Sequence, residues 1–147
     1  MMRLTETAQG LVIAYPAWLG LLAFALGIAL AVWVWRHFTL NGKFLSYCAG
    51  TLVVLFAGIY FLTYKAELTP EQGRTYAAFR SGHAQVDWRQ ARSVVLEERP
   101  GKGTPMYIVV DTTRGTRFEI NASDLSGSDR ARVLAYIRAQ IQRAAKS

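Results

Sequence analysis

Two long runs of uncharged residues near the N-terminus constrain this chain more than any other feature. Leu11 to Trp35 contains 25 residues without a charge, and Phe44 to Tyr64 contains 21. A helix of about 20 apolar residues crosses the hydrocarbon core of a bilayer. Aromatic residues lie near the ends of both runs, as expected for rings at headgroup level. We therefore predict two transmembrane helices, about 11–35 and 44–64, joined by the polar loop 36–43 into an antiparallel hairpin.

The first run is longer than the apolar stretch of a cleaved signal peptide, which has about 7–15 residues. Its end also lacks the small residues that signal peptidase needs, so we predict an uncleaved anchor. The cations that flank the hairpin outnumber those in its loop by four to two, which predicts both termini in the cytoplasm of a bacterium, beneath its inner membrane. These cations are Arg3, Lys65, Arg74 and Arg80 in the flanks, and Arg36 and Lys43 in the loop.

Small residues recur on one face of each predicted helix. Such a face lets helix backbones approach closely in lipid, so it can pack the hairpin against itself or dock another membrane subunit. The candidate packing residues are Gly20, Ala23, Gly27 and Ala31 in the first helix, and Gly50, Ala57 and Gly58 in the second. Neither run contains Asp, Glu, Lys, Arg or His, so nothing in them supports an ion path, a proton path or a ligated redox cofactor.

Charge concentrates in the rest of the chain. The sequence is 52% hydrophobic and 18% charged, and of its net charge of +7, residues 1–64 hold +2 and residues 65–147 hold +5. One cysteine and no internal repeat exclude a disulfide-rich miniprotein and a coiled-coil rod. The sequence therefore predicts a membrane hairpin over 1–64 and one small basic domain over 65–147.

Short alternating runs in the second part predict about five strands and one helix. After Ser126-Gly127-Ser128-Asp129, a run without glycine or proline to Lys146 predicts a C-terminal amphipathic helix, which either serine can cap. Its apolar stripe faces the sheet, while Arg132, Arg143 and Lys146 lie on the other side. The predicted strands are Thr75–Phe79, Ala84–Trp88, Gln90–Leu96, Met106–Thr112 and Thr116–Ile120. The predicted bulk of the core is Phe79, Trp88, Tyr107, Phe118 and Tyr136.

No catalytic, metal-binding or cofactor-binding residue is predicted. His37 and His83 lie on opposite sides of the membrane in the predicted topology, and Cys48 lies inside a span, so zinc has no ligand set. Gly101-Lys102-Gly103-Thr104 is similar to the end of a phosphate loop, but the first glycine of that motif is absent and a strand follows. We therefore expect a protein that is not an enzyme and binds no cofactor.

The segment Val86–Val94 reads Val-Asp-Trp-Arg-Gln-Ala-Arg-Ser-Val, a strand transition of the form apolar-x-Trp-x-x-apolar-x-x-Val. With the hairpin Tyr107–Ile120 and the helix 128–145, it resembles the bacterial membrane-anchored proteins that carry a pleckstrin-homology-like domain. The resemblance covers about residues 65–145. It implies a curled antiparallel sheet or partial barrel plugged by the C-terminal helix, with a role in binding or scaffolding rather than catalysis. Ser81-Gly82-His83 is too poor in cations to carry over the phosphoinositide loop of eukaryotic members.

Two hypotheses of different classes remain. In the first, the chain is a membrane-anchored scaffold whose domain binds a protein partner, as an accessory or assembly subunit of a membrane complex. In the second, the domain senses anionic lipid through Arg132, Arg143 and Lys146, since a cation near an anionic leaflet is worth about 1 kcal/mol. Nucleic acid is disfavoured as a partner because the cations of the domain are mixed with nine acidic residues and the domain is tethered to a bilayer.

Overall fold

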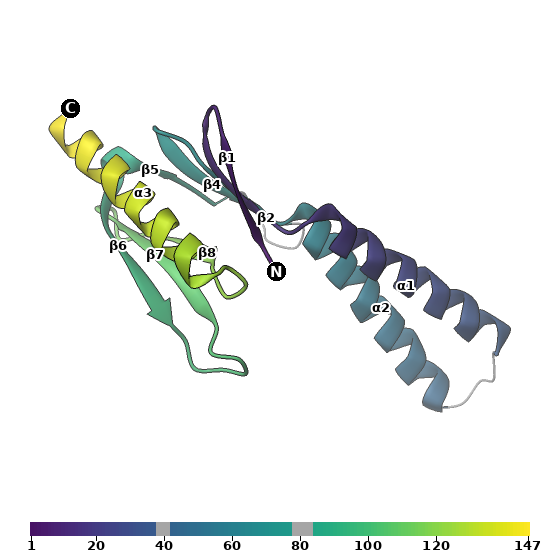
Figure 1. Cartoon of the computed structure of the whole chain (residues 1–147). Helices are drawn as coiled ribbons and strands as arrows, with labels where there is room; N and C mark the ends of the chain where they lie inside the picture. The colour runs from purple at the N-terminus through teal and green to yellow at the C-terminus, as the bar shows by residue number, and fades with distance from the viewer. Residues whose placement is uncertain (38–41, 78–83) are drawn as a thin grey trace. The chain divides into compact units, whose positions relative to one another are not determined.

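A computed structural model describes the chain except residues 38–41 and 78–83. The described residues form three α-helices and two antiparallel sheets, which confirms the predicted α+β class (Figure 1). The elements in chain order are β1 (Arg3–Thr7), β2 (Gly10–Ala14), α1 (Ala17–Arg36), α2 (Gly42–Thr63), β3 (Lys65–Leu68), β4 (Gln72–Tyr76), β5 (Ala84–Asp87), η1 (Trp88–Gln90), β6 (Ala91–Glu98), β7 (Met106–Thr112), β8 (Arg117–Asn121) and α3 (Gly127–Lys146).

The helices α1 and α2 are long and apolar enough to cross a membrane. Only 11% of the most apolar window of each is buried, so their apolar side chains are not packed into a soluble core. A cluster of aromatic rings gathers at the start of α1 and the end of α2. Tyr15 lies edge-on to Phe61 with ring centres 4.8 Å apart, and edge-on to Tyr64 at 5.9 Å.

The predicted start of the first helix, at residue 11, is wrong. Leu11 to Ala14 belong to strand β2, in which Leu11 and Ile13 are buried and their neighbours are half-buried. An uncharged run has no feature that separates a buried strand from the helix that follows it. The helix begins at Ala17 because Pro16 has an extended backbone, with φ −62° and ψ 133°, and donates no backbone hydrogen bond.

The five-stranded sheet has the order β1-β2-β3-β4-β5, with antiparallel pairing throughout. Its central feature is the pairing of β2 with β3, in which Ala14 faces Lys65 and Leu11 faces Leu68. In the sequence, the whole helical hairpin therefore lies between β2 and β3, which are neighbouring strands of one sheet. The strands β1, β2 and β3 were not predicted, and the turn predicted between β4 and β5, Ser81-Gly82-His83, lies outside the described residues.

The three-stranded sheet β6-β7-β8 confirms the predicted run of later strands, shifted by at most two residues at any end. Alternate residues of β7 and β8, namely Ile108, Val110, Phe118 and Ile120, are buried. Helix α3 packs against β6 and η1. Its N-cap is Ser126, whose hydroxyl oxygen accepts a hydrogen bond from the Asp129 backbone N–H at 3.1 Å.

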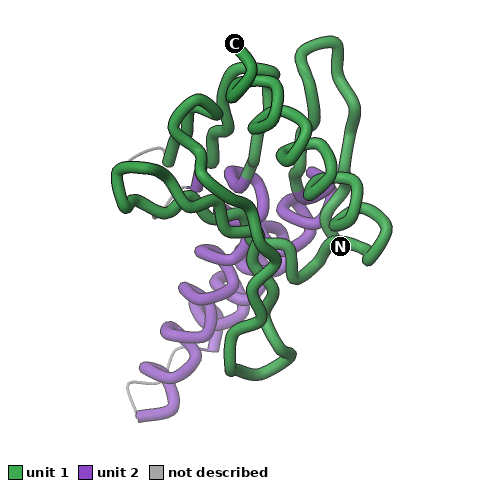
Figure 2. The backbone as a smooth tube through the Cα atoms, turned by 90° about the vertical axis from the view of Figure 1, so that its left-hand side faces the viewer, with its two compact units in different colours: residues 1–14, 65–76, 80–147 green, residues 15–64, 77–79 purple. Residues whose placement is uncertain are grey.

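The chain forms two compact units (Figure 2). One contains Met1–Ala14, Lys65–Tyr76 and the strands and helix from Ala84 onward, and the other contains the helical hairpin, Tyr15–Tyr64. This division differs from the predicted boundary at residue 64, because the first 14 residues pair with the sheet. The largest fully buried side chains of the sheet unit are Ile13, Leu68, Trp88, Ile108, Val109, Val110, Ile120, Val133 and Ile137.

Candidate functional site

The two helices of the hairpin pack closely where glycines face the opposite helix. A Cβ atom at Gly20 would lie 2.5 Å from Leu62 Cγ, and one at Gly27 would lie 2.5 Å from Leu55 Cδ2. Of the other candidate packing residues, Gly58 is buried at the same interface, whereas Ala23 and Ala57 are half-buried and Ala31 and Gly50 are exposed. Of the predicted small residues, Gly20, Gly27 and Gly58 therefore lie buried between the helices. Ala31 and Gly50 do not.

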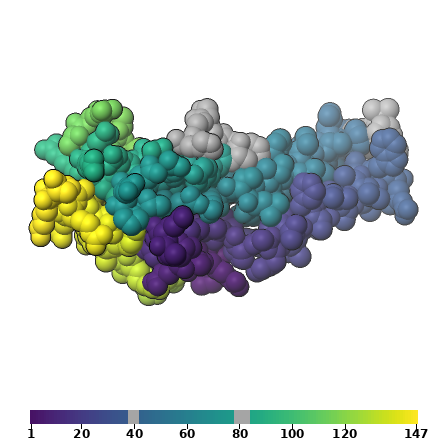
Figure 3. Space-filling view, turned by 90° about the horizontal axis from the view of Figure 1, so that it is seen from above, coloured from purple at the N-terminus to yellow at the C-terminus, as the bar shows by residue number. Residues whose placement is uncertain are grey.

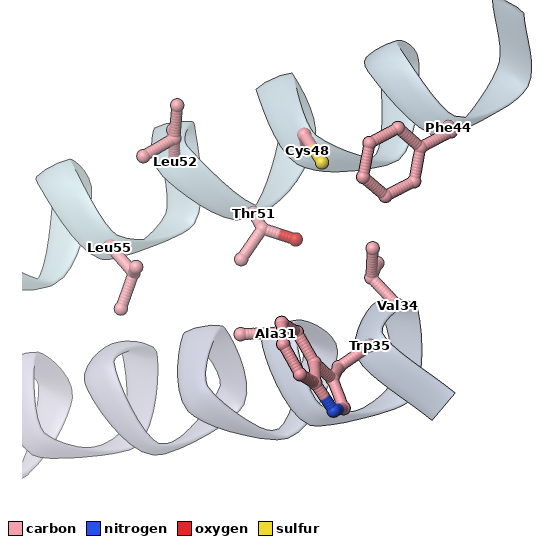
Figure 4. Close-up of a pocket in the computed structure, with 8 residues that line it drawn as sticks. All are labelled: Ala31, Val34, Trp35, Phe44, Cys48, Thr51, Leu52 and Leu55. Atoms are coloured by element: carbon pink, nitrogen blue, oxygen red, sulfur yellow. The ribbon is translucent and has the colours of Figure 1, made fainter. Parts of the chain in front are cut away.

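Toward the loop end of the hairpin, an apolar groove of about 430 Å³ separates the helices (Figure 4). Trp35 of α1 and Phe44 of α2 line the end nearest the loop, and Cys48 and Thr51 line its middle. The Thr51 hydroxyl donates a hydrogen bond to the Tyr47 carbonyl at 2.9 Å, which leaves the groove almost without free polar groups. Its remaining lining residues are Ala31, Val34, Leu52 and Leu55.

Gly58→Ile is expected to weaken the hairpin, because the new side chain would meet backbone atoms of α1. A Cβ atom at Gly58 would lie 3.0 Å from the Phe24 nitrogen and 3.3 Å from the Gly20 oxygen. Overpacking of this kind costs about 1–3 kcal/mol. Gly50→Ile is the matched control, since nothing lies within 4 Å of that position. In an SDS titration of the full chain in micelles, Gly58→Ile should unfold earlier and Gly50→Ile as the wild type does. Equal midpoints would contradict this packing.

In the sheet unit, a cluster of ion pairs covers one face of the three-stranded sheet. We name it the charged sheet face, and its residues are Glu97, Arg99, Tyr107, Asp111, Arg117 and Glu119. Arg99 lies at its centre. Its Nη2 and Nη1 donate to the two Glu119 carboxylate oxygens at 2.5 and 3.2 Å, and its Nε donates to Glu97 at 3.0 Å. Arg99 also stacks over the Tyr107 ring, 4.4 Å from its centre. These two carboxylates raise the pKa of the Arg99 guanidinium.

A second arginine extends the cluster along the same face. Arg117 Nε donates to Asp111 at 3.0 Å, and its Nη1 lies 3.7 Å from Glu97. Val109, in the middle of this face, is fully buried, and Val95 beside it on β6 is 44% exposed. The face therefore combines paired charges, a half-buried tyrosine and one exposed aliphatic side chain.

This cluster was not predicted from the sequence, although Arg117 and Glu119 alternate with the apolar residues Phe118 and Ile120. The charges of β8 signal a solvated strand face. Which carboxylates meet which arginines depends on the register of three strands. Glu97 faces Tyr107 and Val109 faces Glu119, and these pairings cannot be read from the separate segments.

Trp88, at the corner between β5 and β6, confirms its predicted place in the core. It is 1% exposed, and its indole Nε1 donates to the Thr69 carbonyl at 2.7 Å. Phe118 is also buried as predicted, whereas Tyr107 and Tyr136 are half-buried and Phe79 lies outside the described residues. Burial raises the pKa of the Tyr136 hydroxyl, which keeps this group neutral.

The three predicted lipid-contact residues have different surroundings. Arg132 forms an ion pair with Glu6 of β1, and the space-filling view shows the purple N-terminal residues beside the yellow-green part of α3 (Figure 3). Arg143 lines a polar cavity of about 350 Å³ together with Glu71 and Asp87. Lys146 is exposed at the end of α3. Arg132 is thus compensated by a carboxylate that the predicted domain did not include.

Within the part of the chain that the structure describes, no group of three or more His, Cys, Asp or Glu side chains could hold a metal ion. Gly103 and Thr104 have φ values of +80° and +47°, and they lie in the loop between β6 and β7. His37 stacks on Trp33 at the end of α1, and His83 lies outside the described residues.

No family model matches the sequence, and a search of curated proteins gives no match.

Proposed function

We propose that this chain is a membrane-anchored interaction protein, in which a pleckstrin-homology-like unit binds a protein partner through the charged sheet face. Support for the pleckstrin-homology-like fold comes from the two antiparallel sheets and the helix that follows them and packs on one of their edges. The resemblance read from the sequence implies this combination of a curled sheet and a C-terminal helix.

The charged sheet face is the observation that carries the proposal. Exposed ion pairs stabilise a fold by only about 0–1 kcal/mol, so stability gives little reason for five charged side chains on one face. Arginine and tyrosine are enriched where protein interfaces gain most of their binding energy. Arg99 is held by Glu97 and Glu119 and stacked on Tyr107, so it loses little conformational entropy when a partner binds.

The helical hairpin supports the anchoring half of the proposal. It leaves the sheet after Ala14 and returns at Lys65, and these two residues are partners in neighbouring strands. The linkers are Tyr15-Pro16 on one side and Tyr64 on the other, so only three residues join the strands to the helices. We place the hairpin in a bacterial inner membrane with both termini in the cytoplasm, on the excess of flanking cations over loop cations.

The lipid-sensing alternative is less well supported by the residues predicted for it. Arg132 is paired with Glu6, and Arg143 shares a cavity with two carboxylates, which reduces the positive field of this helix face. A lipid surface would be attracted by uncompensated cations. A protein surface can instead match alternating charges one by one.

Site-specific photocrosslinking in native membranes tests the proposal. A photoreactive residue at Val95, which lies beside the charged sheet face on β6, should form one discrete protein adduct in full-length protein. The same residue at Ala139, exposed on α3, should not form it. Arg99→Ala should reduce the Val95 adduct about ten-fold, since an arginine that anchors an interface contributes more than about 1 kcal/mol.

Arg114→Ala is the matched control, because it removes one exposed arginine from the turn between β7 and β8 and leaves the cluster intact. It should keep the adduct. Equal adducts at Val95 and Ala139, or equal loss with Arg99→Ala and Arg114→Ala, would contradict a specific partner at this face.

A further inference from the structure

We propose that the cavity between β6 and α3 binds a phosphate group. The cavity has a volume of about 300 Å³ and is separate from the charged sheet face. Strand β6 contributes Arg92, Ser93 and Val94, and helix α3 contributes Arg138, Ile141 and Gln142. This volume is at the lower end of the range for ligand pockets and suits a phosphate with a small attached group.

Two arginines reach this cavity from different elements. Among the described residues, neither Arg92 nor Arg138 forms an ion pair, so no carboxylate already neutralises either guanidinium group. Two like charges beside one cavity repel each other, and an anion between them removes that repulsion. The guanidinium group presents paired N–H donors that match the spacing of phosphate oxygens, so two arginines can bind one phosphate from two sides.

The backbone of β6 is irregular where the first arginine leaves it. Ala91 faces Thr112 and Ser93 faces Asp111, so Arg92 has no partner across the ladder and forms a bulge. A bulge redirects a side chain that a regular strand would point elsewhere, and bulges are frequent beside functional sites. This irregularity places Arg92 at the cavity beside Ser93 and Val94.

The rest of the lining fits an anion as well. Arg138 and Gln142 are four residues apart on α3, and Ile141 is three residues from Arg138, so the three share one helix face. The Ser93 hydroxyl and the Gln142 amide can both donate hydrogen bonds. Val94, which is 7% exposed, and the half-buried Ile141 give the cavity an apolar side. The nearby Asp111 is already paired with Arg117.

The shared chemistry is a phosphate monoester, which a lipid headgroup or a soluble metabolite can supply. Two arms distinguish these sources, both with the full chain in phosphatidylcholine nanodiscs. In the first arm, glycerol 3-phosphate is titrated by calorimetry. In the second arm, phosphatidic acid is included in the nanodisc, and hydrogen exchange is followed in peptides that cover β6 and α3.

We expect binding in at least one arm, seen as heat in the first or as slower exchange of β6 and α3 in the second. Arg92→Gln with Arg138→Gln should weaken it about ten- to hundred-fold, because two charge-assisted contacts are lost. The matched control is Lys102→Gln with Arg114→Gln, which removes the same charge from two exposed loops and should bind as the wild type does.

The outcomes separate a site from general electrostatic attraction. Binding only to phosphatidic acid assigns a lipid headgroup, and binding only to glycerol 3-phosphate assigns a soluble ligand. No binding in either arm, unchanged binding in the Arg92/Arg138 variant, or equal weakening in the loop control would overturn the proposal. All four arginine and lysine positions are exposed, and the exchange of each variant without phosphate shows whether it has kept its fold.

Discussion

A chain in which Asn-Gly replaces residues 15–64 is expected to fold as a soluble protein, whereas the fragment 65–147 is expected not to fold. The paired residues Ala14 and Lys65 end neighbouring antiparallel strands, about 4.7–4.9 Å apart. A two-residue Asn-Gly turn closes such a hairpin with the twist that strands prefer. The replacement keeps β1 paired with β2, and β2 paired with β3.

The fragment 65–147 lacks the N-terminal part of the core. Met2, Leu11 and Ile13 are 3%, 7% and 0% exposed, and full burial of such a side chain stabilises a fold by about 1.5–3 kcal/mol. The free energy lost with these side chains and with the hydrogen bonds between β2 and β3 approaches the whole free energy of unfolding of a small domain, about 5–15 kcal/mol. The N-terminal strands also supply Glu6 for Arg132.

Size-exclusion chromatography and amide NMR spectra provide the measurement. The Asn-Gly chain should elute as a compact species with dispersed amide signals, and the fragment should give collapsed signals or aggregate. Ile13→Asp in the Asn-Gly chain should unfold it, while Thr5→Asp, at an exposed position of β1, should be tolerated. Dispersed signals and cooperative unfolding of the fragment would show that β1 and β2 are dispensable.

The N-terminal strands show where sequence reasoning reached its limit. Uncharged length was enough to predict both helices, because a helix satisfies its own backbone hydrogen bonds whatever the rest of the chain does. The last four residues of β2, Leu11 to Ala14, are also the first four residues of the uncharged run. The lack of charge therefore did not distinguish this strand from the helix that follows it. Strand β2 is defined only by its pairing with β3, and the partner residues Ala14 and Lys65 are separated by the entire hairpin.

The candidate sites show the same division between local and long-range information. The amphipathic stripe of α3 and the alternation in β8 were readable because both repeat within a few residues. The ion pair of Arg132 with Glu6 joins residues 126 positions apart, and the β6–α3 cavity joins Arg92 to Arg138. The bulge that places Arg92 at the cavity is a feature of strand register, which the sequence of β6 alone does not specify.

Trp88→Ala is expected to destabilise the sheet unit by about 3–5 kcal/mol, the usual cost of truncating a buried aromatic side chain. The Trp88 side chain is 1% exposed and closes the corner where β5 turns into β6. Its ring lies against Gly73 of β4, where a Cβ atom would come within 2.9 Å of Trp88 Cη2. The glycine thus makes room for the ring, and its lack of a side chain leaves nothing at position 73 itself to fill the cavity that alanine creates.

Trp88 stabilises the fold through the burial of its ring and through the hydrogen bond of its indole. A second variant separates these two contributions. Trp88→Phe keeps an aromatic ring but removes the Nε1 donor from the Thr69 carbonyl, so it should cost less than alanine, about 1–3 kcal/mol. Hydrogen exchange of β6 and α3 amides in the full chain measures the opening free energy of both variants. Ala139→Gln, at an exposed position of α3, should stay within about 0.5 kcal/mol of the wild type. If Trp88→Ala left exchange in β6 and α3 unchanged, the indole would not hold the corner between the two sheets, and the side chain would be free to serve as a binding residue instead.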